Sequence, residues 1–353
     1  MRKRAAGILI IAVATGCATN ASSPSTAIDG GVPEAGTVSP DGGGAGPAAC
    51  TTTSLKLAPN AGVMFLVGDT SNLYVDTRTT VATGDAFWRI PKSGGPATAI
   101  AQGVASNGKQ VQAMALDDQY IYWVTEESAS SLSTVSRMPL SGGTPSTLVD
   151  NRPIQYGTLV VAAGALFWGE RVETDPRART GRVAKMSVAG GQVEVLATTD
   201  RVPWAIAVGG GFAYWTTEGD NNNGSSIGKS LLRAPVGGGP SEKVIDQILD
   251  DALATNASSI LYLGDDDKIA VLPFTALAPS ASVDLFPVSE IAASDTHVYA
   301  LNGGSMLSRA SLDGTGVAVK LAATSNGTWH GILVDERCVY WGDIAEGVFT
   351  IQK

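Results

Sequence analysis

Side chains that perform acid–base or metal chemistry are scarce in this 353-residue chain. It contains two histidines, His297 and His330, and three cysteines. Two histidines exclude a His-rich metal site, and the chain has no HExxH or CxxC sequence. His297 takes a repeat position that Phe212 and Cys338 take elsewhere, so we interpret it as structural. No metal or other cofactor is predicted.

Three segments are similar to ligand-binding loops but lack the context that those loops need. Residues 223–230 (NGSSIGKS) are similar to a phosphate-binding P-loop, yet they lead into a strand-like apolar segment instead of a helix. Residues 219–224 and 264–267 cluster oxygen ligands that suit calcium, without the alternating ligands and downstream glutamate of an EF-hand. We interpret the first as part of a strand and the other two as solvated loops.

An eleven-residue segment occurs seven times, and its copies end 37 to 48 residues apart. Each copy joins strand-like apolar residues to a turn, and no stretch shows the 3.6-residue apolar period of a helix. Such repeats are typical of β-propeller blades. The sequence therefore predicts an all-β, seven-bladed β-propeller, with six blades as the alternative because the first copy is the weakest. The copies are FLVGDTSNLYV (65–75), AMALDDQYIYW (113–123), TLVVAAGALFW (158–168), AIAVGGGFAYW (205–215), LATNASSILYL (253–263), EIAASDTHVYA (290–300) and GILVDERCVYW (331–341).

Each repeat predicts four strands. The aromatic second strand is followed by a third strand with a basic residue near its end, then by a glycine turn and a fourth strand. Glycine supplies the positive φ angles that tight hairpins need. The fifth repeat differs, because Val271 stands at the basic position and its turn is alanine-rich. The basic residues are Arg89, Arg137, Lys185, Arg233 and Arg309.

Three segments resemble the YWTD-type (TolB/NHL-type) propeller repeat: Val-Tyr-Trp-Gly-Asp at 339–343, Ala-Tyr-Trp-Thr-Thr at 213–217 and Ser-Arg-Ala-Ser-Leu-Asp-Gly at 308–314. The pattern extends over about residues 61–353. The best-known members have six blades. The Asp that follows Tyr-Trp-Thr in that family is missing from most copies here, so the resemblance implies a fold and no functional residue.

The two ends of the repeat region predict how the ring closes. The last repeat offers three strands, 331–335, 338–342 and 347–352, and residues 54–57 precede the first repeat. We expect this N-terminal strand to complete the last blade, which leaves no open edge inside the ring. Cys50 and Cys338 then lie on one face of that blade, and we predict a disulfide between them, with two unpaired thiols as the alternative.

Blade geometry also predicts a candidate ligand-binding site. Residues before the inner strand and residues after the aromatic strand emerge on the same face of an antiparallel blade, around the mouth of the central channel. This mouth face gathers aromatic rings and carboxylates, which suit a cationic or sugar-like ligand. The alternative is a generally acidic surface without a ligand. The residues are Gln112, Tyr156, Trp204, Asp251, Glu290, Trp329, His330, Glu126, Glu170, Glu218, Asp265 and Asp343.

The N-terminal residues predict export. Three basic residues precede an apolar stretch at 7–13, which is too short to span a bilayer comfortably. Ala14-Thr15-Gly16-Cys17 then resembles the lipobox of bacterial lipoproteins, which implies acylation of Cys17 and, because Ala18 is not acidic, an outer-membrane location. An ordinary secretory signal is the alternative. The predicted parts are a signal peptide at 1–16, the lipidated cysteine with a disordered Gly/Pro/Ser/Ala-rich tether at 17–49, and the propeller at 50–353.

Charge limits the partners. Without residues 1–16 the chain has 21 Lys and Arg against 33 Asp and Glu, a net charge of −12. This acidity argues against nucleic acid and anionic lipid headgroups, so we expect membrane contact through the lipid anchor only. The predicted function is a binding or scaffold module for an envelope protein or glycan, more consistent with a non-enzyme than an enzyme. A propeller-type lyase or hydrolase that uses the mouth face is the alternative.

Overall fold

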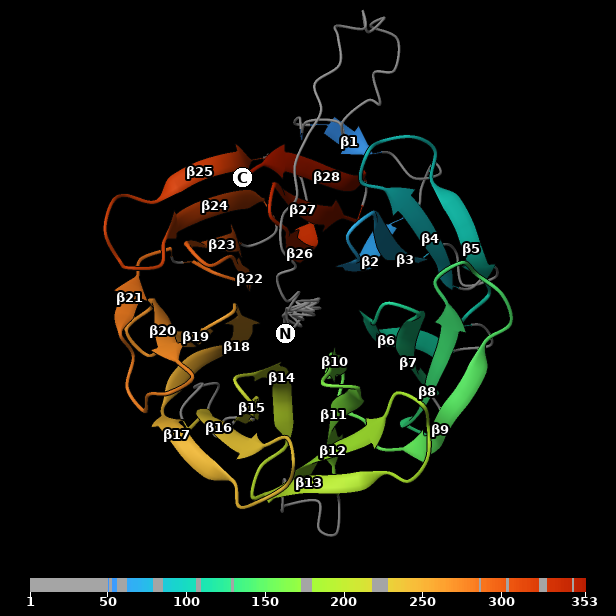
Figure 1. Ribbon diagram of the computed structural model, residues 1–353, viewed down its shortest axis with the longest axis horizontal. Helices are drawn as coiled ribbons and strands as arrows, with labels where there is room; N and C mark the ends of the chain where they lie inside the picture. The colour runs from blue at the N-terminus through green and yellow to red at the C-terminus, as the bar shows by residue number, and fades with distance from the viewer. Residues whose placement is uncertain are drawn as a thin grey trace, which may run out of the picture.

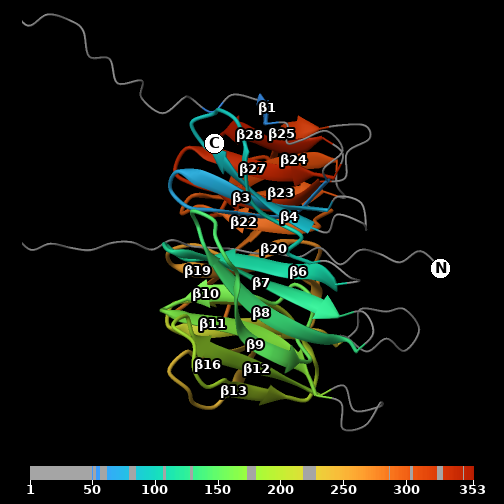
Figure 2. The same ribbon diagram turned by 90° about the vertical axis from the view of Figure 1, so that its right-hand side faces the viewer.

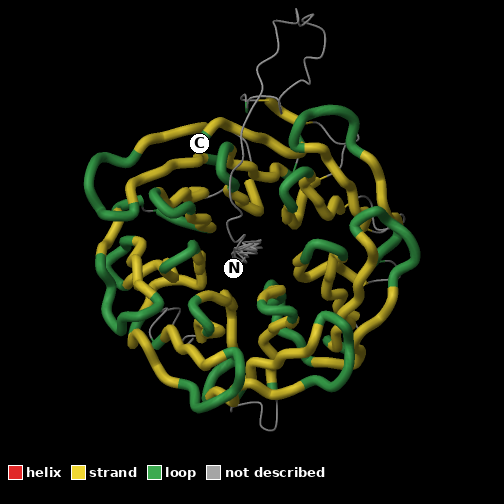
Figure 3. Tube along the Cα trace, in the orientation of Figure 1, coloured by secondary structure: helices red, strands yellow, loops and turns green. Residues whose placement is uncertain are grey.

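The computed structural model describes residues 50, 53–55, 62–78, 85–105, 109–127, 130–172, 180–217, 228–285, 287–302, 305–323, 329–344 and 346–353. The predicted signal peptide, the tether with Cys17, and Glu218 lie outside these residues. Within the described ranges every regular element is a strand (Figure 3), and no helix is long and apolar enough to span a membrane.

Seven four-stranded antiparallel sheets surround a central axis (Figures 1 and 2), so the seven-bladed prediction is confirmed and the six-bladed alternative is excluded. From the axis outward, blade 1 consists of β2 (Gly62–Gly68), β3 (Asn72–Arg78), β4 (Asp85–Pro91) and β5 (Thr98–Gln102). Blade 2 consists of β6 (Lys109–Leu116), β7 (Tyr120–Glu127), β8 (Leu132–Pro139) and β9 (Ser146–Arg152). Blade 3 consists of β10 (Val160–Ala162), β11 (Ala165–Arg171), β12 (Gly181–Ser187) and β13 (Glu194–Thr199). Blade 4 consists of β14 (Pro203–Gly209), β15 (Phe212–Thr217), β16 (Ser230–Pro235) and β17 (Glu242–Asp246). Blade 5 consists of β18 (Ile248–Thr255), β19 (Ser259–Gly264), β20 (Ile269–Pro273) and β21 (Ala281–Val283). Blade 6 consists of β22 (Glu290–Ala293), β23 (His297–Asn302), β24 (Met306–Ser311) and β25 (Val319–Ala323). Blade 7 consists of β26 (Trp329–Val334), β27 (Cys338–Asp343), β28 (Gly347–Gln352) and β1 (Thr53–Leu55).

The core lies between the blades, because both faces of each sheet are covered by neighbours. The second strands carry the largest buried side chains, including Trp123, Trp168, Trp215 and Trp341. Adjacent blades interlock through such rings: Phe87 of blade 1 meets Trp123 of blade 2 edge-on, with ring centroids 5.0 Å apart. The aromatic second strand of the repeat is therefore the element that holds one blade against the next.

The predicted glycine turns and basic residues also have defined structural roles. The two glycines that connect the third and fourth strands have positive φ in blades 1 to 4, for example 96° at Gly238 and 139° at Gly239. The basic side chain near the end of the third strand reaches the next blade. Lys185 Nζ lies 3.1 Å from the Val236 carbonyl oxygen, and Arg233 Nη1 lies 3.4 Å from that of Phe274. These residues thus donate hydrogen bonds between neighbouring blades.

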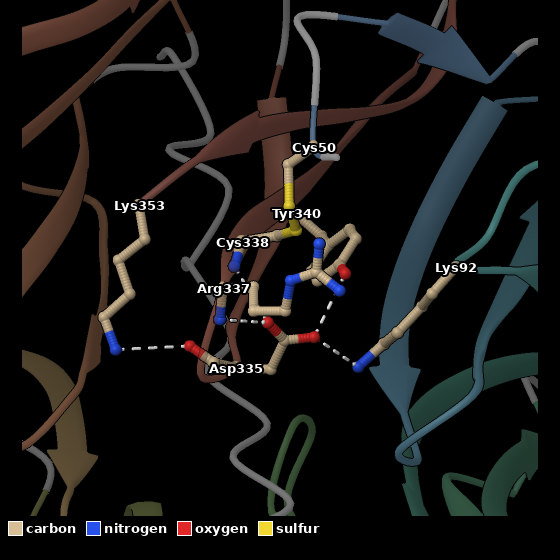
Figure 4. Close-up of a disulfide and its surroundings, with 7 residues drawn as sticks. All are labelled: Cys50, Lys92, Asp335, Arg337, Cys338, Tyr340 and Lys353. Atoms are coloured by element: carbon tan, nitrogen blue, oxygen red, sulfur yellow. Dashed lines mark hydrogen bonds and ion pairs between the residues drawn. A yellow bond between two sulfur atoms is a disulfide. The ribbon is translucent and has the colours of Figure 1, made fainter. Parts of the chain in front are cut away.

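The ring closes as predicted. β1 pairs antiparallel with β28, so the chain segment that precedes blade 1 completes blade 7. Cys50 and Cys338 form a disulfide with a Cα–Cα distance of 5.9 Å (Figure 4). Next to it, the Asp335 carboxylate accepts hydrogen bonds from the Tyr340 hydroxyl (3.0 Å) and from Lys92 Nζ of blade 1 (2.9 Å). The disulfide and the ion pair both lie where the first and last blades meet.

Candidate functional site

The mouth face is the side of the disk where the second strand of each blade leads to the third and where one blade leads to the next. The opposite side, which we call the turn face, carries the turns between first and second strands and between third and fourth strands. Inner strands are irregular near the mouth face: register shifts occur between Val111 and Ala113 in blade 2, and between Pro203 and Ile206 in blade 4. Such bulges redirect side chains. They contain the predicted site residues Gln112 and Trp204.

Glu170 is fully buried and is held by two arginines. Arg152 of blade 2 donates from Nε to Oε1 (2.7 Å) and from Nη2 to Oε2 (3.0 Å), and Arg182 donates from Nε to Oε2. Trp168 Nε1 adds a bond of 2.8 Å. Burial alone would raise the pKa of Glu170, but these hydrogen bonds outweigh it and hold the pKa below its usual value. Glu170 therefore acts as an anchor between blades 2 and 3 and not as an open carboxylate.

Asp251 and Glu290 are buried carboxyl groups in blades 5 and 6. Asp251 accepts hydrogen bonds from Lys229 and from the Thr216 hydroxyl (3.0 Å), both of blade 4. Burial raises the pKa of Asp251 to about 6. Glu290 is 2% exposed, and its Oε2 accepts the backbone N–H of Gly331 at 2.8 Å.

Glu290 also pairs with His330 across the boundary between blades 6 and 7. Its Oε1 lies 3.4 Å from His330 Nδ1. Burial raises the pKa of Glu290, and the hydrogen bond to Glu290 raises the pKa of His330. Both shifts favour the protonated form of each group.

The remaining predicted polar residues differ in exposure. Gln112 donates from Nε2 to Glu126, which is half-buried. Asp343 is 1% exposed and accepts the backbone N–H of Glu346 at 2.9 Å, whereas Asp265 is exposed. Only part of the expected negative charge thus faces solvent.

The predicted aromatic residues separate into two groups. Trp204 and Tyr156 are partly exposed, and Tyr156 reaches Phe65 of blade 1 with ring centroids 6.4 Å apart. Trp329 is 5% exposed and packs against Trp341, with ring centroids 5.3 Å apart. The structure therefore brings Trp204 and Tyr156 to the face and places Trp329 in the core of blade 7.

Sequence reasoning missed several residues of this face. Asp85 of blade 1 is 4% exposed and accepts the backbone N–H of Val111 in blade 2 at 3.0 Å. The partners Arg152, Arg182 and Lys229 were also not predicted. Arg182 lies directly opposite Glu170 in the β11–β12 pair, and opposite charges at facing positions are a usable signal once the register is known. In the described part of the chain, no three His, Cys, Asp or Glu side chains group together as metal ligands.

These features define the chain as a β-propeller of seven four-stranded blades. It matches no protein-family model and no curated protein. Among solved structures it is similar to YCF48 bound to D1 peptide, with 10% identity, a TM-score of 0.60, and coverage of 87% of this chain and 100% of that chain. It is also similar to the β-propeller domain of the Trilobed protease from Pyrococcus furiosus, with 10% identity, a TM-score of 0.58, and coverage of 82% and 95%. An acylaminoacyl peptidase shares 12% identity and a TM-score of 0.57, over 80% of this chain and 49% of that chain. At these identities the likeness shows the fold alone.

Proposed function

We propose that this protein is an exported, lipid-anchored binding or scaffold module that engages a protein or glycan through its mouth face. The observation that carries the proposal is the pairing of two partly exposed rings, Trp204 and Tyr156, with a surrounding set of fixed hydrogen-bonding groups. Glu170 and Asp251 are buried and engaged by cationic side chains, which fixes neighbouring blades beneath the mouth face and so favours a preorganised surface. A peptide is the ligand class to test first, since the solved YCF48 structure contains a bound peptide.

The anchor part of the proposal rests on the n-region, the apolar stretch and the small residues before Cys17. The expected location is the outer membrane. Metabolic labelling with a clickable fatty acid is expected to label the wild type and not the Cys17→Ser variant. Equal labelling of the two proteins would refute the anchor and leave the binding proposal unaffected.

The mouth-face part is tested with a Trp204→Ala/Tyr156→Ala variant in a pull-down from cell-envelope extract and on a glycan array. We expect the variant to lose the captured protein or glycan at least about tenfold, since exposed aromatic anchors commonly dominate such interfaces. Leu277→Ala is the matched control, because Leu277 is 60% exposed and lies on the turn between β20 and β21, on the opposite face. Unchanged binding by the double variant would exclude the mouth face as the site.

One observation favours the alternative, a lyase or hydrolase at the same face. The buried Glu290 and the partly exposed His330 form an acid–imidazole pair of the kind that general acid–base catalysis uses. The peptidase with a similar fold supports testing this class, although the present chain spans about half of it. A His330→Gln variant is the test: loss of turnover of a peptide or glycan substrate, with binding retained, would establish the enzyme and overturn the binding module.

A further inference from the structure

Near the mouth face, the second and third strands of blades 1, 2 and 3 carry a pair of facing residues, two positions beyond the last residue of the eleven-residue repeat. In blade 1 the pair is Thr77 and an alanine, and in blade 2 it is Thr125 and Thr134. In blade 3 it is Glu170 and Arg182. Blades 1 and 2 fold with an uncharged pair at this place, so the propeller architecture does not require charged residues there.

The charged residues of blade 3 also carry a cost. Glu170 is fully buried, and Arg152 of blade 2 and Arg182 are both held against its carboxylate. Buried ion pairs and triads lose solvation, and they often stabilise a protein no more than uncharged residues of similar volume do. An arrangement that is costly and that the fold does not require points to a use in addition to anchoring the two blades.

The arginines, and not Glu170, have free capacity for a ligand. Oε1 of Glu170 accepts hydrogen bonds from Arg152 Nε and Trp168 Nε1, and Oε2 accepts them from Arg152 Nη2 and Arg182 Nε. Because both arginines contact Oε2, their guanidinium groups lie side by side. Among the described residues, Arg152 Nη1 and both terminal nitrogens of Arg182 have no hydrogen-bond partner. The two side chains are 25% and 28% exposed, so these N–H groups are open to solvent.

The charge and the donors of this arginine clamp, Arg152 with Arg182, suit a carboxylate. Two guanidinium groups against the single carboxylate of Glu170 leave one unit of positive charge, which a monoanion balances. The planar guanidinium N–H groups also match the two oxygens of a carboxylate. A phosphate monoester carries about −1.5 to −2 charges, which exceeds what the clamp balances. Asp150, two residues before Arg152, is exposed and would repel the excess.

We propose that Arg152 and Arg182 bind a carboxylate group of the mouth-face ligand, with Glu170 as the residue that positions them. This differs from the cationic ligand expected from the sequence, because at the boundary between blades 2 and 3 the acidic residue is buried and the arginines are exposed. The inference deepens the proposed function and rests on it for a ligand at this face. An acidic side chain and a uronic acid both present a carboxylate, and separate arms of the test distinguish them.

The test records the arginine Nε–Hε signals of the protein by ¹H–¹⁵N NMR, with propionate and its uncharged isostere propionamide as probes. We expect saturable shifts of the Arg152 and Arg182 signals with propionate and none with propionamide. N-acetyl-glutamic acid α-amide and glucuronate then represent a protein and a glycan source of the carboxylate. The tighter of the two assigns the source.

Two variants of the clamp and one control show whether the arginines are responsible. Arg182→Gln should weaken propionate binding at least about tenfold, because a charge-assisted contact is lost. Arg152→Lys/Arg182→Lys keeps both positive charges against Glu170 but has no terminal N–H fork, so it should weaken binding comparably without leaving a buried charge unpaired. Arg309→Gln is the matched control and should bind propionate as the wild type does, since Arg309 is a partly exposed arginine of β24 near the turn face.

Three results would overturn the proposal: no saturable shifts with propionate in the wild type, equal shifts with propionamide, or unchanged binding by either clamp variant. Tighter binding of phosphate than of propionate would overturn it as well, because the clamp would then not select a monoanion. The titration needs no captured partner. Its failure therefore leaves the Trp204→Ala/Tyr156→Ala test of the proposed function standing, and a failure of that test leaves the titration result unaffected.

Discussion

At the scale of single residues, the residue that begins the turn between the first and second strands decides whether a buried tyrosine hydroxyl has a hydrogen-bond partner. In blades 1, 2 and 7 the turn between the first and second strands begins with an aspartate, whose carboxylate accepts a hydrogen bond from the hydroxyl of the tyrosine five residues later. The pairs are Asp69 with Tyr74, Asp117 with Tyr122 and Asp335 with Tyr340. Where the turn begins with Gly209 or Ser294, the hydroxyls of Tyr214 and Tyr299 are buried without a hydrogen-bond partner among the described residues. Because leaving a buried hydroxyl unpaired costs free energy, the aspartates contribute to the stability of their blades.

Asp335 is the aspartate for which we expect the largest effect, since it also pairs with Lys92 of blade 1. Asp335→Ala should lower the free energy of unfolding by about 2–3 kcal/mol, because it leaves the Tyr340 hydroxyl and two backbone N–H groups unpaired. Urea unfolding measures the change. Asp117→Ala removes the corresponding aspartate of blade 2, for which the described residues show no ion pair to another blade, so it should cost less. An equal or larger cost would show that the Lys92 pair adds nothing to the stability.

The same residue predicts a pH dependence. Burial alone would raise the pKa of Asp335, but hydrogen bonds from Lys92 and from two backbone N–H groups hold it below the usual value. A carboxyl whose pKa is depressed on folding stabilises the protein above the unfolded-state value of about 3.9, and that contribution is lost as the pH falls below it. The stability gap between wild type and Asp335→Asn should therefore narrow below about pH 4. A gap that is constant from pH 7 to pH 3 would contradict the assignment.

At the scale of elements, each blade is a strand meander whose turns require particular backbone angles. Gly239 ends its turn with a φ of 139°, which side-chain-bearing residues rarely adopt. Gly237 in the same turn does not have positive φ, and a Cβ atom added to it would meet no other atom within 4 Å. Glycine is therefore required by the backbone conformation at position 239 and not at position 237.

Gly239→Ala should destabilise the protein by about 1–2 kcal/mol, because alanine is strained at that φ. Gly237→Ala should change the stability by less than about 0.5 kcal/mol or raise it slightly, since it restricts only the unfolded chain. Thermal unfolding of both variants is the measurement. Equal midpoints for the two variants would show that the turn relaxes and that the positive φ is not required.

At the scale of the whole molecule, the ring depends on one seam, where β1 pairs with β28 and Cys50 joins Cys338. The disulfide closes a loop with a sequence separation of 288 residues. In the chain-entropy description, a cross-link over so long a loop stabilises the folded state by about 5 kcal/mol. Loss of the disulfide at this seam should therefore lower the stability of the whole seven-bladed ring.

A Cys50→Ser/Cys338→Ser variant should unfold at a markedly lower urea concentration than the oxidised wild type, by up to about 5 kcal/mol in free energy. Dithiothreitol should lower the stability of the wild type to that of the variant and leave the variant unchanged. Non-reducing peptide mapping should recover the two cysteines in one linked peptide pair. Stability of the wild type that is insensitive to reductant would show that strand pairing alone holds the seam.

The sequence by itself predicted the propeller, the order of the strands in its blades and the closing strand, and it favoured seven blades over six and a Cys50–Cys338 disulfide over two unpaired thiols; the structure decided between these alternatives. These features follow from alternation, turn residues and chain connectivity, which are local or repeat along the chain. Only the tertiary structure decided that Glu170 is neutralised by Arg152 and Arg182, that Trp329 is in the core, and that Phe274 lies against Gly209. The physical reason is that these contacts join residues of different strands or blades. Their register depends on connecting loops and bulges, which the repeat pattern does not specify.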